Sequence, residues 1–519
     1  MSYNPYLEEI KSNLPRLLAL FDRDSTSQSH GMGDRYFWAW GLIDFGNGTF
    51  QGAAHGMARL WTSGLWPYPT SSVAFLARIS AMIQASSRLI RRDGSLEEAF
   101  PHEGSYCVTA LVAFDLLCTM DLLDAEITSD QRANWNACIR PMIGYLTKAD
   151  ETHALISNHL ATAVAALTRW HRQTDDNDAE EKAKQLMDRI LSNQSQEGWF
   201  CEYGGADPGY QSLCTYYLAD VHRTRPDWNL FKPLLRSIRF LQHFAHPDGS
   251  FGGLYGSRCT RFYYPAGVIA LSDAIPEANS LSSFMEVSIA EKRTVTLSAI
   301  DEPNLIPMFN AYAWAAAQYD QKQVINSKCI PATSTTSFRR WFPEAGLLID
   351  RGTTHYSLVS THKGGVVYHF IHGKPTALID AGIVIRNSRG QFGSTQGYNT
   401  KNNLVTSKEM LQITAQVTAM PKKLPSPQQF LLIRLLGMTA FRSRTFREWI
   451  KRLLVKLLIT RKNPWPVTNH RQIRLGLNLS IQDRIISAPG YHHEEDIHYF
   501  VPIHMASQGY WQMQDEQEV

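Results

Sequence analysis

The chain has 519 residues, of which 44% are hydrophobic and 19% charged, and its formal net charge is +3. This length allows two or three domains with a large core. The near-neutral charge excludes a protein that binds nucleic acid through bulk positive charge, and we expect no nucleic-acid partner.

The N-terminal segment, MSYNPYLEEIKSNLPRLLALFDRD, does not resemble a secretory signal, because acids precede a short apolar run and no small-residue cleavage site follows. No apolar run approaches the roughly 18 to 20 residues that span a bilayer. Seven cysteines without a CxxC pair fit a reducing compartment. We therefore expect a cytoplasmic protein whose thiols are mostly buried.

Glycine-rich turns recur along the first half of the chain, at steps of 47, 104 and 51 residues. They read GNGTF (46–50), DGSLEEAF (93–100), EGWFCEYGG (197–205) and DGSFGGLYG (248–256). The middle step is close to two periods, and the polar segment LTKADETHALISNH supplies a turn near residue 147. A period of about 50 residues indicates a helical repeat.

Each interval contains two helix-length segments whose apolar residues are spaced by three or four. The pairs are 105–123 with 131–149, 158–172 with 178–194, and 210–223 with 230–246. About six such hairpins, ending near 311–320, would close as an α/α toroid. The turns would then converge on one face of the toroid and form a cleft there.

From about residue 337 the chain alternates short β-rich segments with turn signals, as in FRRWFPEAGLLIDRG, GGVVYHFIHG and RQIRLGLNLSIQDRIISA. The predicted fold class is therefore multidomain α+β. Residues 1–330 form the α/α toroid that carries the cleft. Residues 331–519 form an antiparallel β-sandwich domain.

One segment interrupts the β-domain. Residues 428–462 contain nine Lys or Arg against one Glu, with apolar residues spaced for one helical face. A basic amphipathic helix is typical of a membrane-surface element. A solvated insertion and a partner interface are the alternatives, and a homo-oligomer is among the candidate partners.

Asn158 and His159 begin a predicted helix, and Tyr210 follows His159 by 51 residues, one repeat. In a purely structural interpretation Asn158 caps the helix and His159 fills a groove. Equivalent loops on neighbouring hairpins would instead bring the three side chains together. An amide, an imidazole and a phenol in an aromatic-lined cleft suit removal of the proton α to a sugar carboxylate. Donors neutralise the carboxylate, and Tyr or His removes the proton.

Two further stretches of the loop face supply candidate substrate contacts. EGWFCEYGGADPGYQSL (197–213) carries acids and tyrosines, while Trp199 and Phe200 are expected to wedge the loop in place. Asp207 and Pro208 fit a helix N-cap and first turn. In GSRCTRFYYP (256–265), structural salt bridges explain one arginine more easily than two. The predicted substrate-binding residues are His102, Glu103, Glu202, Tyr203, Asp207, Arg258, Arg261, Tyr263 and His372.

A toroid followed by a β-domain, with Asn-His at a helix start and Tyr one repeat later, resembles the heparinase II/III-like family. The segment YHFIHGKPTALIDAG (368–382) also resembles that family's strand–turn–strand pattern. The family includes polysaccharide lyases and related uronate-acting enzymes. The resemblance implies that Asn158 neutralises the carboxylate of a uronic acid and that His159 and Tyr210 are the acid/base pair. Loss of the 4-oxygen would make the enzyme a lyase, and return of a proton on the opposite face would make it a C5-epimerase.

The chain departs from the family at Thr361-His362-Lys363-Gly364, where many relatives carry a zinc-linked motif with an acid after the His. We expect no metal and no cofactor. An unexported enzyme with a basic helix would act on a nascent or lipid-linked glycan at the inner membrane face. This favours bacterial exopolysaccharide, capsule or O-antigen biosynthesis, and raises epimerisation relative to elimination.

Three other functions compete with this one. A glycoside hydrolase on a toroid needs two carboxylates across a cleft, for which Glu98, Glu103, Glu202 and Asp207 are candidates. A terpene cyclase or prenyltransferase is disfavoured, since the chain has no DxDD or DDxxD cluster. A glycan-binding scaffold without turnover stays open.

Overall fold

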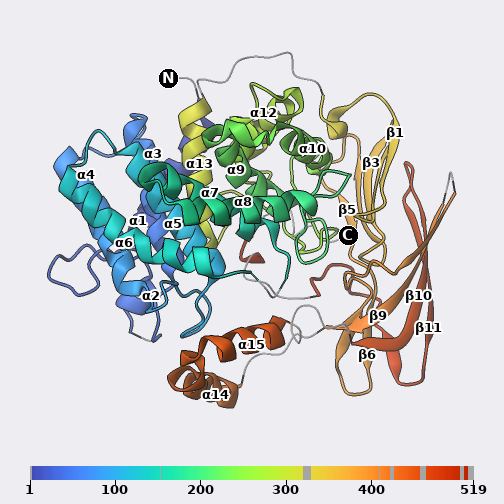
Figure 1. The fold of residues 1–519 in the computed structure, drawn as a ribbon. Helices are drawn as coiled ribbons and strands as arrows, with labels where there is room; N and C mark the ends of the chain where they lie inside the picture. Colours follow the sequence, from blue (N-terminus) through green and yellow to red (C-terminus); the bar gives the residue numbers. More distant parts are fainter. Residues whose placement is uncertain are drawn as a thin grey trace.

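The computed structural model describes residues 3–41, 43–151, 154–319, 329–407, 410–420, 426–455, 463–502 and 508–511. Figure 1 shows a helical region beside a β-rich region, with two helices below them. The change from helix to strand falls between Gln318 and Phe338. The predicted α+β character is confirmed, while the domain boundary at 330 stays a prediction.

Six helices form the inner ring of the helical region, each packed against the next. They are α3 (Ala53–Thr62), α5 (Tyr106–Leu122), α7 (Ser157–Thr174), α9 (Pro208–Thr224), α11 (Pro265–Ala270) and α13 (Glu302–Gln318). Because α13 packs on α3, the ring is closed. At the closure the Asn310 amide donates to the Gly52 carbonyl at 3.0 Å and accepts from the Gly56 N–H at 2.9 Å. The predicted toroid of about six hairpins is confirmed.

Six further helices surround this ring and return the chain between inner helices. They are α1 (Pro5–Leu18), α4 (Ser72–Leu89), α6 (Ser129–Lys148), α8 (Asn177–Ser192), α10 (Phe231–Leu241) and α12 (Pro276–Ala290). A four-residue helix, α2 (Arg35–Trp38), precedes α3. Each outer helix returns the chain to the same end, so the inner helices run parallel and their N-termini share one face. The glycine-rich turns therefore lie on that face, as the repeat predicts.

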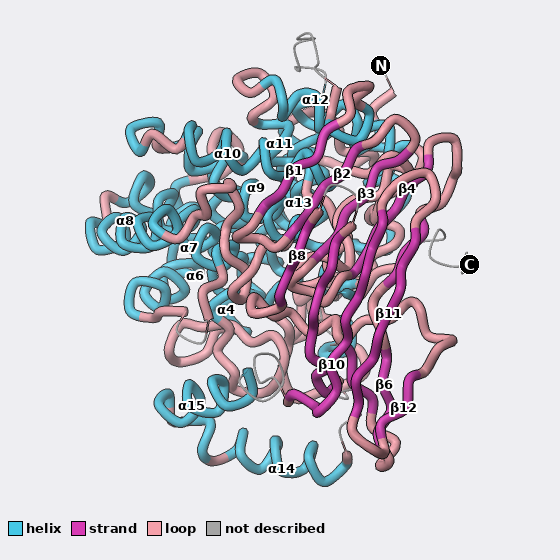
Figure 2. The backbone as a smooth tube through the Cα atoms, turned by 90° about the vertical axis from the view of Figure 1, so that its right-hand side faces the viewer, coloured by secondary structure: helices cyan, strands magenta, loops and turns pink. Residues whose placement is uncertain are grey.

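The β-rich region consists of two antiparallel sheets, seen face-on in Figure 2. The first has the order β1 (Phe338–Phe342), β2 (Leu347–Arg351), β3 (His355–Ser360), β4 (Val366–Ile371), β5 (Leu378–Asp380). The second has the order β11 (Ser480–Ser487), β10 (Pro464–Arg474), β9 (Leu411–Ala419), β7 (Phe392–Ser394), β6 (Val384–Asn387), β12 (Tyr491–His493), with β8 (Asn403–Thr406) paired to β9.

Both sheets contribute to one hydrophobic cluster, in which Leu348 and Val359 of the first sheet meet Ile413 and Ile473 of the second. Along β10 the burial alternates residue by residue, the period expected of a strand with one face in a core. The antiparallel β-rich prediction is confirmed. The sandwich arrangement stays a prediction.

The toroid and the first sheet share a continuous core. The Leu254 N–H donates to the Tyr368 hydroxyl at 3.1 Å, and Tyr356 donates to the His243 carbonyl at 2.7 Å. Glu197 accepts from the backbone N–H groups of Glu344 and Ala345 at 2.8 and 3.0 Å. The face that carries the glycine-rich turns is therefore held against the β-region.

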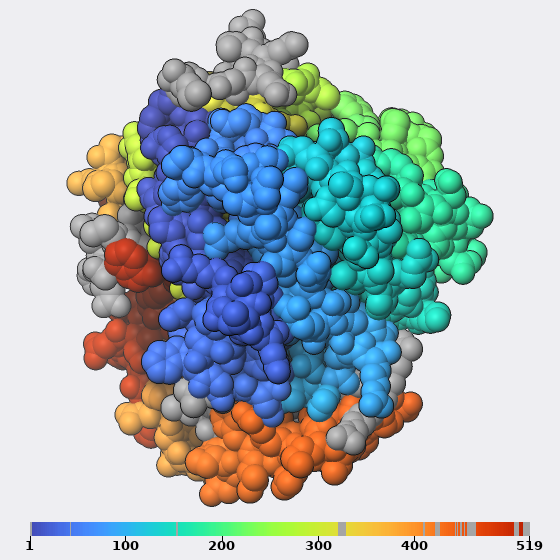
Figure 3. Space-filling view, turned by 90° about the vertical axis from the view of Figure 1, so that its left-hand side faces the viewer, coloured from blue at the N-terminus to red at the C-terminus, as the bar shows by residue number. Residues whose placement is uncertain are grey.

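The insertion in the β-region contains two helices, α14 (Pro427–Met438) and α15 (Arg444–Val455), where one amphipathic helix was expected. Figure 3 shows this segment in orange, along the lower edge of the molecule. Arg434 pairs with Asp44 at 2.9 Å, and Phe441 packs near Phe100 with 5.7 Å between ring centroids. Residues 456–462 of the predicted insertion lie outside the described residues. No helix in the described ranges is long and apolar enough to cross a membrane.

Candidate active site

The loop before α9 lies directly against the N-terminus of α7. The N–H and the hydroxyl of Ser157 both donate to the Cys201 carbonyl, at 3.0 and 2.9 Å. The Tyr203 N–H donates to the Leu155 carbonyl at 3.2 Å. Equivalent loops of neighbouring hairpins thus meet, which is what the 51-residue spacing predicts. Trp199 and Phe200 are buried and anchor the loop in the core, as expected.

Asn158 and Glu202 form a buried pair at this junction. The Glu202 carboxylate accepts from the Asn158 backbone N–H at 3.0 Å and from its side-chain amide at 2.9 Å. Glu202 therefore caps α7 from the neighbouring hairpin, the position that a helix N-terminus offers to an anion. Burial raises the pKa of Glu202 to about 8, against the lowering effect of the two Asn158 hydrogen bonds. Sequence reasoning placed Asn158 against a substrate carboxylate, and the structure places it against a protein carboxyl.

His159 is oriented by a residue that sequence reasoning missed. Its Nδ1 lies 2.7 Å from Oε2 of Glu151, which is almost fully buried, while the His159 side chain is 17% exposed. A carboxylate at Nδ1 holds the proton on that nitrogen and leaves Nε2 as the basic nitrogen. Glu151 lies in a turn without a glycine signature, so the repeat pattern did not single it out.

Tyr203 lies at the centre of the group. The Arg258 guanidinium stacks over its ring, 3.9 Å from the centroid. Burial raises the pKa of Tyr203, Arg258 lowers it, and Tyr210, Glu151 and Glu202 raise it further. Arg258, Tyr210 and the two glutamates therefore lie within electrostatic range of this phenol, and Arg258 is in direct contact with it. Tyr203 adopts a left-handed backbone conformation with φ 55°, which is uncommon for a residue other than glycine.

Tyr210 occupies the first turn of α9 and is half-buried, with its ring 5.4 Å from that of Phe262. Asp207 caps α9 as predicted, accepting from the Tyr210 N–H at 3.2 Å. Asp207 also accepts from the Arg258 N–H at 2.9 Å and is fully buried. Its carboxyl therefore ties the 256–265 loop to α9, and burial raises its pKa.

The other residues of the 256–265 loop separate into two groups. Arg261 is buried and donates to the Tyr499 hydroxyl at 3.3 Å. Tyr263 is fully buried in the toroid core, 5.1 Å from the Phe251 ring, which leaves it no direct path to a glycan. The loop has two adjacent tyrosines, Tyr263 and Tyr264. Of these, Tyr264 interacts electrostatically with Tyr210.

Three other predicted contacts, His102, Glu103 and His372, have neighbours of their own. His102 is next to Arg91 at 2.7 Å. Glu103 accepts from the Ala99 N–H at 2.7 Å within its own loop. His372 is exposed and follows β4, near Arg351 and His355. No hydrogen bond described in the structure joins any of the three to the Asn158–Glu202 pair.

The β-region contributes Tyr398, which sequence reasoning did not identify. Its ring occupies the space that a side chain at Gly205 would need, 2.4 Å from a Cβ built there, and its hydroxyl lies 3.1 Å from Nδ1 of His362. Tyr398 thus packs on the loop that carries Tyr203. Within the described ranges, no cluster of three His, Cys, Asp or Glu is arranged to hold a metal.

No protein-family model matches the chain, and no curated protein is similar to it in sequence. Solved structures resemble its fold only distantly. Chondroitin AC lyase from Streptomyces coelicolor A3, in complex with chondroitin sulphate, is 11% identical, covers 81% of this chain and 67% of its own, and has a TM-score of 0.48. Heparan sulfate lyase HepC from Pedobacter heparinus is 10% identical, covers 93% and 68%, and has a TM-score of 0.42.

A glycoside hydrolase family 76 mannosidase from Bacteroides thetaiotaomicron is 9% identical, covers 61% of this chain and 100% of its own, with a TM-score of 0.40. These likenesses are at 11% identity or below and concern the fold alone.

Proposed function

We propose that the chain acts on a uronic-acid-containing glycan by removing the proton at C5. The observation that carries this proposal is the Glu151–His159 pair at 2.7 Å, beside the Arg258–Tyr203 stack and Tyr210. An oriented imidazole, a guanidinium and two phenols supply a base, a carboxylate partner and a proton donor in one place.

The carboxylate of the sugar would be neutralised by Arg258 and Asn158. The Arg258 Nε is buried without a partner among the described residues, and an amide has two N–H groups, of which Asn158 uses one for Glu202. Such donors stabilise the enolate-like charge that develops as the C5 proton leaves. A protonated Glu202 would strengthen the effect, because it adds no negative charge beside the substrate.

His159 and Tyr210 then act on the proton. One removes it from C5, and the electron pair moves into the carboxylate. In elimination the other donates a proton to the departing 4-oxygen as the C4–O bond breaks and a C4=C5 double bond forms. In epimerisation the other returns a proton to the opposite face of C5. Epimerase and lyase thus share the first step and differ in the second.

The test is incubation of the protein with a panel of uronate glycans in D2O, followed by mass spectrometry and ultraviolet absorbance of the unsaturated uronate. New absorbance identifies a lyase, and deuterium at C5 without absorbance identifies an epimerase. The same assay with Tyr210→Phe should lose both signals. Absence of both signals from the wild type over the whole panel would refute proton abstraction, and binding without turnover would indicate a scaffold.

A glycoside hydrolase is the second candidate, because carboxylates gather on the same face. Burial raises the pKa of the Cys107 thiol, and Glu98, Glu151, Glu202 and Glu103 raise it further, so four acids surround this thiol. A hydrolase would use two of them as acid and base or nucleophile. It should release reducing ends without unsaturation, and it should survive Tyr210→Phe.

We further propose that the α14–α15 segment contacts an anionic membrane surface, which would bring a lipid-linked glycan to the cleft. On α14 the large apolar side chains are exposed, between 37% and 65%, and they are Phe430, Leu431, Leu432, Ile433, Leu435 and Met438. The 428–462 segment carries nine Lys or Arg against one Glu, a charge that complements acidic lipids. This placement would suit capsule, O-antigen or exopolysaccharide synthesis at the inner face of the cytoplasmic membrane.

Co-sedimentation with vesicles tests the membrane contact. Wild type should bind vesicles that contain phosphatidylglycerol and should bind pure phosphatidylcholine weakly. A Leu431→Glu/Leu432→Glu variant should lose binding, whereas Val73→Glu, an exposed apolar residue of α4, should keep it. Equal binding by both variants would exclude α14 as the contact. A concentration-dependent dimer that Leu431→Glu/Leu432→Glu disrupts, without vesicle binding, would assign the surface to a second copy of the chain.

A further inference from the structure

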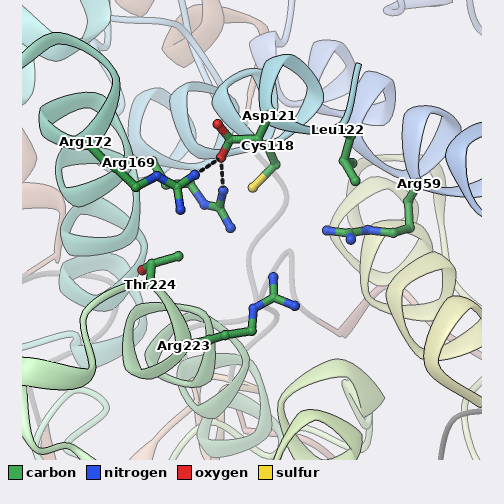
Figure 4. Close-up of a pocket in the computed structure, with 8 residues that line it drawn as sticks. All are labelled: Arg59, Cys118, Asp121, Leu122, Arg169, Arg172, Arg223 and Thr224. Atoms are coloured by element: carbon green, nitrogen blue, oxygen red, sulfur yellow. Dashed lines mark hydrogen bonds and ion pairs between the residues drawn. The ribbon is translucent and has the colours of Figure 1, made fainter. Parts of the chain in front are cut away.

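A cavity lies at the opposite end of the inner ring from the candidate active site, where the parallel helices end. Its volume is about 350 Å³, and its lining residues are Arg59, Cys118, Asp121, Leu122, Arg169, Arg172, Arg223 and Thr224. They come from the last turns of α3, α5, α7 and α9. Figure 4 shows the guanidinium groups of Arg59, Arg169 and Arg223 pointing into one common space.

The acids at this end neutralise only part of the positive charge. Arg169 is buried and donates to Asp220, at 2.9 Å from Nε, and also to Asp121. Arg172 shares Asp121, and Arg223 lies 3.6 Å from Asp220. Two carboxylates, those of Asp121 and Asp220, are therefore shared by three guanidinium groups. Arg59 adds a fourth guanidinium group to the cavity.

The guanidinium of Arg59 makes no ion pair or hydrogen bond in the part of the chain that the structure describes, and its Nε is buried. Its guanidinium stacks over Trp314 at 5.2 Å from the ring centroid, and Arg223 stacks over the same ring at 4.6 Å. Burial lowers the pKa of Arg59, and repulsion from Arg223 and Arg169 lowers it further. Two cations thus share one indole without an acid between them.

Helix dipoles explain only part of this arrangement. The C-terminal ends of helices attract arginines, and each such interaction is worth roughly 0.3–1 kcal/mol on a surface. Arg172 and Arg223, with half-exposed side chains, fit that description. Arg59 does not, because a dipole provides no hydrogen-bond acceptor for a buried Nε, and desolvation of an unpaired guanidinium is unfavourable.

We propose that this cavity binds a small molecule through a phosphate or sulfate group held between Arg59 and Arg223. Guanidinium groups match the oxygens of such anions with two parallel N–H donors each. A dianion offsets the two positive charges that Asp121 and Asp220 leave unbalanced. The volume accommodates the anion together with a small organic portion. The site is separate from the glycan cleft, and it stands whether or not the proposed reaction is correct.

Isothermal titration calorimetry and thermal unfolding with inorganic phosphate and inorganic sulfate test this site, with sodium chloride at matched ionic strength as the reference. The wild type should bind one of the two anions saturably, and its Tm should rise with that anion. Preference for phosphate would indicate a phosphate ester as the ligand, and preference for sulfate a sulfate ester. Loss of one guanidinium should weaken binding by about tenfold or more.

The variants are Arg59→Gln and Arg223→Gln, with Arg132→Gln of α6 as the control. Arg132 pairs with Asp124 on the surface and does not line the cavity. Both cavity variants should lose the anion-dependent rise in Tm, and the control should keep it. Without anion, Arg59→Gln should melt no lower than the wild type, because the guanidinium has no acid or hydrogen-bond acceptor to lose, and the ring of Trp314 on which it stacks is also covered by Arg223.

Three results would overturn the proposal. One is a response of the wild type to phosphate and sulfate that chloride reproduces. Another is a saturable response that survives both cavity substitutions, which would place the anion elsewhere. The third is a drop in the Tm of Arg59→Gln without anion, which would make Arg59 a structural residue.

Discussion

The two ends of the inner ring differ in their ionisable side chains. At the N-terminal end, here called the acid end, the carboxyl groups of Glu202 and Asp207 are buried and accept hydrogen bonds from the backbone N–H groups that begin α7 and α9. At the C-terminal end, arginines that include Arg59 and Arg169 line a cavity. Parallel inner helices explain this polarity, because their dipoles add at each end. In the proposed reaction, a sugar carboxylate bound at the acid end would need Arg258 to offset its charge.

The largest expected effect is on turnover, which should depend on the acid end of the ring and not on the opposite end. His159→Gln should lower turnover of the glycan by about 10²- to 10⁴-fold, the usual contribution of a general acid or base. His171→Gln, near the other end of the same helix, should leave turnover unchanged. Steady-state kinetics of both variants measures the difference. Full activity in His159→Gln would remove the Glu151–His159 pair from the chemistry.

The next effect is on stability, and it distinguishes the buried Arg169 from its exposed neighbour Arg172. Arg169→Gln should lower the free energy of unfolding by about 3–5 kcal/mol, because it leaves Asp220 buried without its partner. Arg172→Gln should cost less than about 1 kcal/mol, since that side chain is 46% exposed. Urea unfolding of both variants provides the measurement. Similar losses in the two would mean that the network does not depend on Arg169.

At the acid end, Glu202 should make the free energy of unfolding depend on pH. The pKa of Glu202 rises from 4.5 to about 8 in the folded protein, so the folded state binds a proton that the unfolded state has released. Stability is therefore fully present below pH 4.5 and is lost as the pH rises through 8, with a slope of at most about 1.4 kcal/mol per pH unit. Glu202→Gln should remove this slope from urea-unfolding data, and Glu8→Gln on the surface of α1 should not. A slope that persists in Glu202→Gln must come from another group.

The smallest effect concerns the contact with the β-region, which only the acid end has. Glu197→Gln should weaken the hydrogen bonds to Glu344 and Ala345 and lower stability by about 1 kcal/mol. Turnover should fall with it, because Glu197 also holds the loop that carries Tyr203. Phosphate or sulfate binding at the far end should be unaffected. An equal loss of anion binding would show that the two ends are coupled.

The sequence predicted the architecture well because its signals are local and repeated. Apolar spacing revealed the hairpins, and glycine-rich turns marked the inner-helix N-termini. Asp207 and Pro208 had a recognisable cap pattern and occupy that position. The meeting of Asn158 with the loop before α9 followed from the repeat length alone.

The remaining features depend on contacts between distant segments. Glu202 caps a helix of the neighbouring hairpin, and nothing in its own loop indicates this. Tyr398 reaches the loop from the β-region, across nearly half of the chain. Arg59 and Arg223 belong to different helices and share only Trp314, so no spacing pattern connects them. Most of the exposed side chains of α14 are apolar, although composition suggested a basic helix.

Closure of the ring through Asn310 has a consequence for how the chain folds during synthesis. Gly52 and Gly56 receive their partner from a residue made more than two hundred positions later. Until α13 leaves the ribosome, α3 lacks one of its two inner neighbours and keeps apolar surface exposed. Unfinished chains of this kind tend to aggregate. Folding of the first hairpin is therefore completed only after the last helix of the ring has been made.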